Sequence, residues 1–171
     1  ELLWFIFISV ISYCNIYLLL LNNKYIFISV FIISCDSITG EEIARLPINK
    51  VSTGEDKLFE EEAVLDLKKG DKISFWSDID LEYKDELFFG FRIRVWKNNV
   101  PYGVIEFEST DKNITIGEFK TNINGKTKWS FTGKNSEMEI KEDAKYKFRG
   151  IFKTSTNESL VVNKAELIIK K

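Results

Sequence analysis

Histidine is missing from this chain, and cysteine is missing from most of it. None of its 171 residues is histidine, so the commonest general base and the commonest metal ligand are both missing. The only cysteines are Cys14 and Cys35, which leaves residues 36–171 without a thiol. That part of the chain can form neither a disulfide bond nor a thiolate metal site. We therefore expect its fold to be held by an apolar core alone.

A marked excess of either charge is also missing. The chain has 24 lysine and arginine residues against 26 aspartate and glutamate residues, which gives a formal net charge of −2. So balanced a composition gives no reason to expect a nucleic acid or an acidic membrane as a partner. We accordingly predict that the protein binds no nucleic acid.

Sequence motifs of catalysis are absent as well. Residues 36–171 contain no nucleophile elbow, no phosphate-binding glycine loop and no thiol. Carboxylates are plentiful, but in a chain this acidic their pairs arise from composition alone, so they are a weak sign of a glycosidase. We expect a protein that is not an enzyme and that uses no cofactor.

The residues that are present fall into two unlike parts. Residues 2–34 are almost wholly apolar, with Lys24 as their one charged residue, whereas residues 36–171 are charged and alternating. The stretch 2–21 is about long enough to span a bilayer as a helix. Its string IFISV, at 6–10, returns at 26–30. Residues 1–21 are therefore either an extra membrane helix or the product of a wrong start, and we assign no function to them.

A second, shorter apolar run ends at Cys35. It follows Lys24, covers residues 25–34 and has the usual length of a signal-peptide core. It closes on Ile32-Ile33-Ser34-Cys35, which is an aliphatic residue, a variable one, a small one and a cysteine. Over residues 23–35 the chain thus resembles the signal of bacterial lipoproteins.

This resemblance implies a lipid anchor. Residues 1–34 would be a leader, the thiol of Cys35 would receive a lipid, and the mature protein would begin at Cys35. Two or three acyl chains hold a protein stably on a membrane. The implied location is the bacterial cell envelope, either periplasmic or surface-exposed. The alternative is a buried or membrane-embedded cysteine at the end of an apolar run.

The part after Cys35 begins without regular structure. Residues 35–61 contain two glycines, a proline and many charges, with little periodicity, which is typical of a linker. We interpret them as a tether with one short strand near 46–51. The folded domain is expected to occupy residues 62–171.

From residue 62 on, short strands alternate with turns, which is typical of an all-β sandwich or barrel. No segment shows a strong 3.6-residue apolar period. About nine strands in about 110 residues suit two packed antiparallel sheets, as in a jelly-roll or immunoglobulin-like sandwich. In style, this region resembles small lipoproteins of Bacteroidota. The expected strands cover 63–67, 72–79, 87–97, 103–108, 114–121, 127–132, 137–140, 145–154 and 160–170.

The period of two assigns one face of each strand to the core. On this basis we expect the following side chains to be buried: Ile73, Phe75, Ile79, Phe89, Phe91, Ile93, Val95, Thr127, Trp129, Phe131, Tyr146, Phe148, Phe152, Ala165, Leu167 and Ile169.

The opposite faces supply the candidate ligand-binding residues. Arg92, Arg94 and Trp96 share an outward parity, and Trp76 has the matching parity in its own strand. An exposed aromatic platform flanked by polar groups can stack on sugar rings or form a contact hot spot for a protein. The alternative is that an outer face is covered by the tether, or that Trp96 packs along the arginine stems.

Three acidic side chains form a weaker candidate site. Asp78, Asp80 and Glu82 alternate along one face and could offer oxygen ligands to Ca²⁺. A solvated acidic rim explains the same pattern, and we prefer it, so no metal is expected.

The sequence therefore predicts a cell-envelope lipoprotein, anchored to the membrane through lipid on Cys35. Its β-sandwich would act as a non-catalytic binding module for a glycan or a protein. The alternative is a structural or interaction subunit of an envelope assembly that binds no small ligand.

Overall fold

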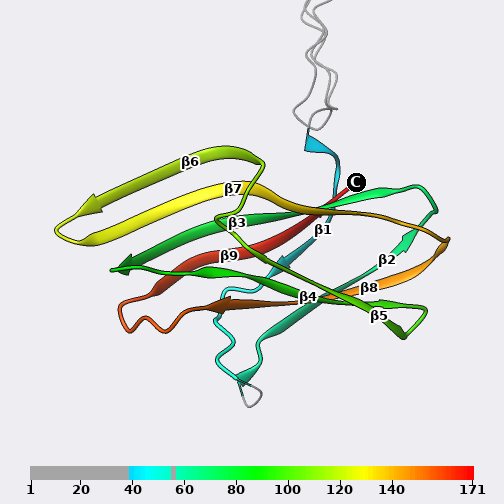
Figure 1. Cartoon of the computed structure of the whole chain (residues 1–171), viewed down its shortest axis with the longest axis horizontal. Coiled ribbons are helices and arrows are strands. Elements are labelled where there is room, and N and C mark those ends of the chain that lie inside the picture. The colour runs from blue at the N-terminus through cyan, green and yellow to red at the C-terminus, as the bar shows by residue number, and fades with distance from the viewer. Residues whose placement is uncertain (1–38, 55–56) are drawn as a thin grey trace, which may run out of the picture. The chain divides into compact units, whose positions relative to one another are not determined.

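The computed structural model describes residues 39–54 and 57–171. Most of them belong to one compact unit, Glu42–Lys171. Cys35 and the leader, residues 1–34, lie outside the described residues. The unit is built from nine strands (Figure 1): β1 (Glu42–Pro47), β2 (Glu60–Leu67), β3 (Lys72–Lys84), β4 (Phe89–Lys97), β5 (Val100–Glu108), β6 (Ile114–Ile123), β7 (Lys126–Glu139), β8 (Ala144–Thr154) and β9 (Val161–Lys170).

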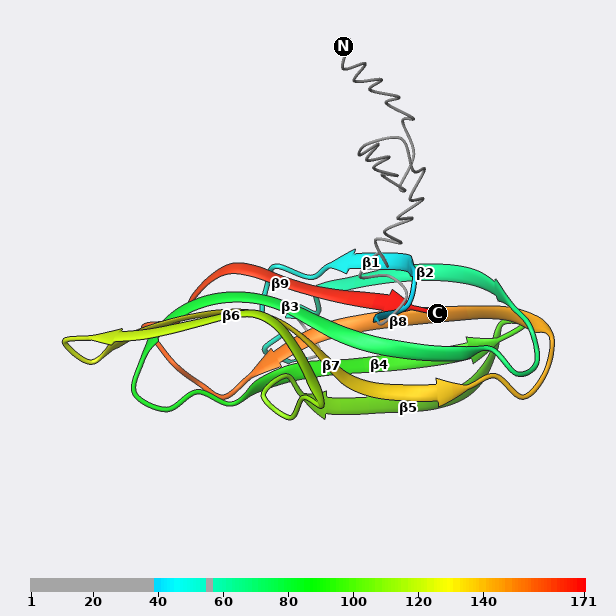
Figure 2. The same cartoon turned by 90° about the horizontal axis from the view of Figure 1, so that it is seen from above.

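The strands form the two antiparallel sheets that the sequence predicts. Sheet A has the order β1-β9-β3-β7-β6, and sheet B has the order β2-β8-β4-β5. Without β6, the chain passes between two four-stranded sheets with the connectivity of a jelly roll. Strand β6 is an addition to this plan, because it pairs only with β7 and makes the outer edge of sheet A. In Figure 1 the strands β6, β7, β3 and β9 of sheet A lie above β4, β8 and β5 of sheet B, and in Figure 2 the two sheets overlap.

The core between the sheets confirms the predicted inward faces. The four residues of β4 expected inside, Phe89, Phe91, Ile93 and Val95, are all buried. Aromatic rings meet across the layers: the ring centroids of Phe75 and Phe148 lie 5.7 Å apart in an edge-to-face arrangement. Period-two patterning therefore located the core correctly, because each strand has one solvated face.

The expected boundary between tether and domain is wrong by about twenty residues. Strand β1 pairs with β9 along its length, and it lies within the segment interpreted as a tether. Leu46 and Ile48 are 1% and 2% exposed, so this segment supplies part of the core. The short strand expected near 46–51 lies earlier, at Glu42–Pro47, and spans only six residues, which was too little to mark the segment as part of the domain.

Strand β7 joins two strands that were expected to be separate, 127–132 and 137–140. A bulge explains the difference, because Phe75 pairs with Ser136 while Trp76 pairs with Lys134, which leaves Asn135 without a partner on β3. The side chain of Asn135 instead donates to three backbone carbonyls of the β5–β6 connection, those of Glu108, Ser109 and Asp111.

Two buried serines complete this polar network. The Ser77 hydroxyl donates to Oδ1 of Asn135 at 2.7 Å, and Oγ of Ser109 lies 2.9 Å from Oγ of Ser77. Ser77 and Ser109 are both fully buried. The network fixes the chain where it crosses from sheet B to sheet A.

Candidate functional site

The outer face of sheet B brings together three of the four residues predicted to bind a ligand. Arg92, Arg94 and Trp96 point outward from β4, because the alternate residues between them are buried. Strand β8 lies alongside, with Lys147 opposite Trp96 and Arg149 opposite Arg94.

Trp96 lies among three cations on this face. Its ring centroid is 4.8 Å from Nζ of Lys147, 5.2 Å from Cζ of Arg149 and 5.8 Å from Cζ of Arg94. Its side chain is partly exposed. The π-face of an indole attracts cations, so these contacts orient the ring and the charged groups together.

Carboxylates from the flanking strands pair with the arginines. Glu60 of β2 contacts both Arg94 and Arg149, and Glu62 accepts a hydrogen bond from Arg149 at 2.8 Å. That hydrogen bond lowers the pKa of Glu62 and raises the pKa of Arg149. The face is thus a network of fixed donors and acceptors rather than a basic patch.

The same pattern continues toward β5. Glu106 lies 3.7 Å from Nε of Arg92 and 3.0 Å from Nζ of Lys153. The outward positions of β4 therefore run from Gly90 through Arg92 and Arg94 to Trp96, over about 20 Å at the usual rise per residue.

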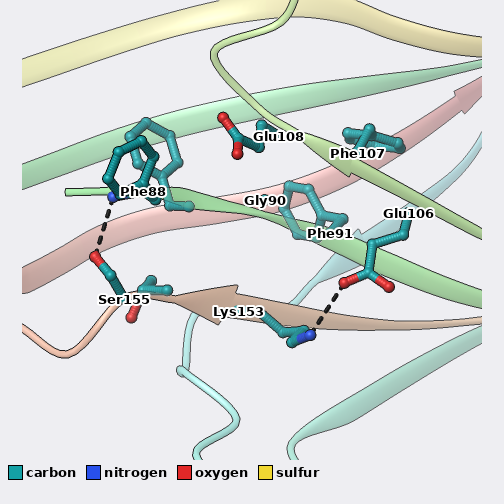
Figure 3. Close-up of a pocket in the computed structure, with 10 residues that line it drawn as sticks. Phe88, Gly90, Phe91, Glu106, Phe107, Glu108, Lys153 and Ser155 are labelled. Atoms are coloured by element: carbon teal, nitrogen blue, oxygen red, sulfur yellow. Dashed lines mark hydrogen bonds and ion pairs between the residues drawn. The ribbon is translucent and has the colours of Figure 1, made fainter.

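A pocket of about 410 Å³ opens at the beginning of this strip (Figure 3). Phe88 is 59% exposed beside it, and its backbone N–H donates to Oγ of Ser155. Gly90 is required here, because a Cβ atom would lie 2.1 Å from the carbonyl oxygen of Phe107. Lining residues shown in Figure 3 include Phe107, Glu108 and the Glu106–Lys153 ion pair.

Sequence reasoning missed this pocket. The available signal was the string Phe88-Phe89-Gly90, in which two adjacent phenylalanines cannot both face the core of a strand. A glycine inside a strand also marks a close backbone approach.

Trp76, the fourth predicted residue, does not belong to this face. It lies in sheet A beside Ile168 of β9, and it is only 1% exposed. Its indole N–H donates to Oγ of Ser74 at 3.0 Å, and Nζ of Lys170 is 4.9 Å from its ring centroid. The predicted outward parity is correct, but Trp76 and Trp96 cannot form one platform because their strands belong to different sheets.

The weak candidate for a metal site is occupied by cations of the protein itself. Asp78 contacts Arg45 at 3.0 Å and Lys164 at 3.4 Å. Glu82 contacts Lys126 at 2.5 Å, and this hydrogen bond lowers its pKa. Within 39–54 and 57–171, no group of three or more histidine, cysteine or acidic side chains converges as metal ligands would.

Comparison with known proteins gives no information about this site. No known protein family matches this chain, and no curated protein sequence does either. Among the described residues, no helix is long and apolar enough to cross a membrane.

Proposed function

We propose that this chain is a lipid-anchored envelope lipoprotein, and that its jelly roll is a non-catalytic module that binds a glycan. The anchor is the lipidated Cys35, and the binding face is the outer face of sheet B. The observation that carries the proposal is the strip along β4, from the pocket at Gly90 to Trp96. It combines an open hollow, a partly exposed indole and polar groups at regular spacing.

The chemistry of the strip suits an extended, hydroxyl-rich ligand. A sugar hydroxyl both donates and accepts hydrogen bonds. On this face it could accept from a guanidinium group and donate to a paired carboxylate. Their geometry is fixed by ion pairs before a ligand arrives, which lowers the entropic cost of binding. A chain of sugar units would lie along β4, with its rings against Phe88 at one end and Trp96 at the other.

A second candidate function is protein interaction without a small ligand. It is favoured by the three cations within 6 Å of the Trp96 ring, which compete with a sugar for the face of the indole. Tryptophan and arginine are also the residues most enriched in contact hot spots between proteins.

A glycan array probed with residues 36–171 tests the binding proposal. We expect binding to a subset of glycans, and we expect Trp96→Ala to reduce it by about tenfold or more. The control is Val161→Ala, which shortens an exposed side chain in sheet A. If no glycan is retained, or if Trp96→Ala and Val161→Ala bind equally well, the glycan assignment is wrong and the protein-interaction candidate replaces it.

The anchor is tested separately by metabolic labelling with a fatty-acid analogue in a bacterial host. Cys35→Ser should abolish the label, whether or not the protein stays in the membrane fraction. Cys14→Ser is the natural control, because it removes the only other cysteine and should leave the label unchanged. Persistent labelling of the Cys35→Ser variant would refute lipidation at this position.

A further inference from the structure

Strand β6 carries a row of exposed apolar side chains that the jelly roll does not use. Ile114, Ile116, Phe119 and Ile123 are 38% to 69% exposed. Their partners on β7 are Lys134, Thr132, Ser130 and Lys126, which alternate with the buried residues of β7 and therefore lie on the outer face of sheet A. A register shift between Ile116 and Phe119 keeps the row on one face. We call these four residues the β6 stripe.

The other three edges of the sheets carry features that hinder association, although β5 also exposes Val100, Tyr102 and Val104. Strand β1 has only six residues and ends at Pro47. Strand β2 begins with three glutamates, 60–62, and β5 contains Pro101 and two glutamates. Short length, proline and charge are the usual means of keeping an edge from association. Strand β6 has ten residues, no proline and an apolar outer face.

The hairpin of β6 and β7 is also locally basic. Residues 112–134 contain five lysines and one glutamate, although the whole chain has a formal net charge of −2. Lys112 pairs with Glu118 and Lys134 with Glu137. The remaining cations exceed their carboxylates, because Lys126 and Lys128 share Glu82.

Lys120 adds a further positive charge. It is exposed, but it lies on the opposite face from the β6 stripe, because its β7 partner Trp129 faces the core; its Nζ lies 3.6 Å from the centroid of the Trp129 ring. On the side of the β6 stripe, Lys126, Lys128 and Lys134 pair with only Glu82 and Glu137, which leaves an excess of about one positive charge there.

We propose that the β6–β7 hairpin docks on the surface of a lipid bilayer that carries anionic headgroups. Apolar side chains beside lysines are the composition that binds such an interface, where the side chains enter the headgroup region and the lysines meet the anionic lipids. The tip of the hairpin extends beyond the ends of the other strands (Figures 1 and 2), so it can reach a flat surface without obstruction by sheet B.

The lipid anchor of the proposed function supports this docking. The chain from Cys35 to Glu42 is seven residues long and spans at most about 25 Å when extended. A lipid on Cys35 would therefore hold β1 close to the bilayer. Four strand spacings, about 19 Å, separate β1 from β6 in sheet A. The anchor and the stripe would act as two attachment points at opposite edges of one sheet.

Vesicle binding of residues 36–171, which contain every strand and lack Cys35, tests the docking without the anchor. We expect retention on vesicles of phosphatidylglycerol mixed with phosphatidylcholine, and weaker retention on phosphatidylcholine alone. Phe119→Ser combined with Ile123→Ser should weaken binding about tenfold or more. The matched control is Val64→Ser combined with Val100→Ser, which alters side chains of similar exposure, 52% and 63%, on the edges of sheet B.

Nitroxide labels at single positions show whether the β6 stripe enters the lipid, even if a serine variant loses binding because it folds poorly. Because residues 36–171 contain no cysteine, Phe119→Cys and Val64→Cys each give one site for a nitroxide label. The label at 119 should become accessible to oxygen in the lipid phase when vesicles are added, and the label at 64 should stay in water. Equal behaviour of the two labels, or no retention on either kind of vesicle, overturns the docking and leaves the stripe to a protein partner. Fatty-acid labelling of Cys35 is unaffected by either result, so failure of the docking and failure of the anchor are distinguishable.

Discussion

Gly150 shows at the scale of one residue how closely the two sheets pack. It lies in β8 between Phe148 and Phe152 on the core face. A Cβ atom there would lie 2.8 Å from Cδ1 of Ile48 and 3.2 Å from Cδ2 of Leu167. The missing side chain therefore makes room for residues of the opposite layer, including one from the segment after β1.

We predict that Gly150→Ala destabilises the fold by about 1–3 kcal/mol, because the methyl group forces neighbours in a filled core to shift. Gly103→Ala is the matched control, since a Cβ atom at that position of β5 meets nothing within 4 Å. Urea unfolding followed by tryptophan fluorescence measures both. Equal free energies of unfolding for the two variants would show that this part of the core has unfilled space.

Sequence periodicity predicts the side to which a residue points, but not the sheet to which its strand belongs. This is why Arg92, Arg94 and Trp96 were grouped correctly, since they share one strand. Trp76 was grouped with them wrongly, because parity has no meaning between strands that do not pair. The closeness of Lys147 and Arg149 to Trp96 likewise depends on the pairing of β8 with β4, which is a non-local contact.

At the scale of elements, the bulge at Asn135 connects the two sheets. Asn135 has no partner residue on β3, and its side chain donates to the backbone carbonyls of residues 108, 109 and 111, where the chain leaves β5 for β6. Alternation of apolar and polar residues cannot reveal such a contact. The bulge interrupts this alternation, which is why β7 was predicted as two strands.

We predict that Asn135→Ala costs about 2 kcal/mol, because it removes one acceptor of the buried Ser77 hydroxyl and the donor to three backbone carbonyls. Asn122→Ala removes a single hydrogen bond, from an exposed amide to the hydroxyl of Thr127, and should change stability by about 1 kcal/mol or less. Hydrogen exchange of residues 109–113 should accelerate in the first variant only. Unchanged exchange there would contradict the proposed role of the network.

Strand β1 leads to a second prediction about elements. A chain that begins at residue 60 lacks Leu46 and Ile48 and leaves β9 with an unpaired edge. Loss of two buried aliphatic side chains costs about 4 kcal/mol or more, so this chain should melt at least about 10 °C below one that begins at residue 39. Circular dichroism during heating measures the difference. Equal melting temperatures would show that the domain begins near residue 62, as the composition suggested.

At the scale of the whole molecule, average charge conceals local charge. The formal net charge of −2 argued against an acidic membrane, yet the folded chain places lysines of β7 beside an apolar stripe of β6. Their concentration was visible in residues 112–134 of the sequence. The exposure of the stripe was not, because it depends on β6 being an edge strand.

Stability should depend on pH in one direction only. The hydrogen bond from Arg45 lowers the pKa of Glu42, and those from Lys112 and Trp129 lower the pKa of Glu118. A carboxyl group with a lowered pKa in the folded state stabilises the fold above its ordinary pKa of 4.5, and this contribution is lost as pH falls through the lowered value. Without histidine, little should titrate between roughly pH 6 and 9.

We therefore predict a nearly constant free energy of unfolding from about pH 6 to 9 and a decrease below about pH 4.5. The double variant Glu42→Gln, Glu118→Gln should show a shallower decrease, because two of the responsible groups no longer titrate. Urea unfolding at a series of pH values measures this. A decrease centred near neutral pH would contradict the account.

The central proposal is that the working protein begins at Cys35 and is held on a membrane by lipid. Mass spectrometry of the N-terminal peptide of the protein expressed in a bacterial host tests it most directly. The account predicts a peptide that begins at Cys35 and carries the mass of a diacylglyceryl group on its thiol. A peptide that continues upstream through Ser34, with an unmodified Cys35, would contradict it.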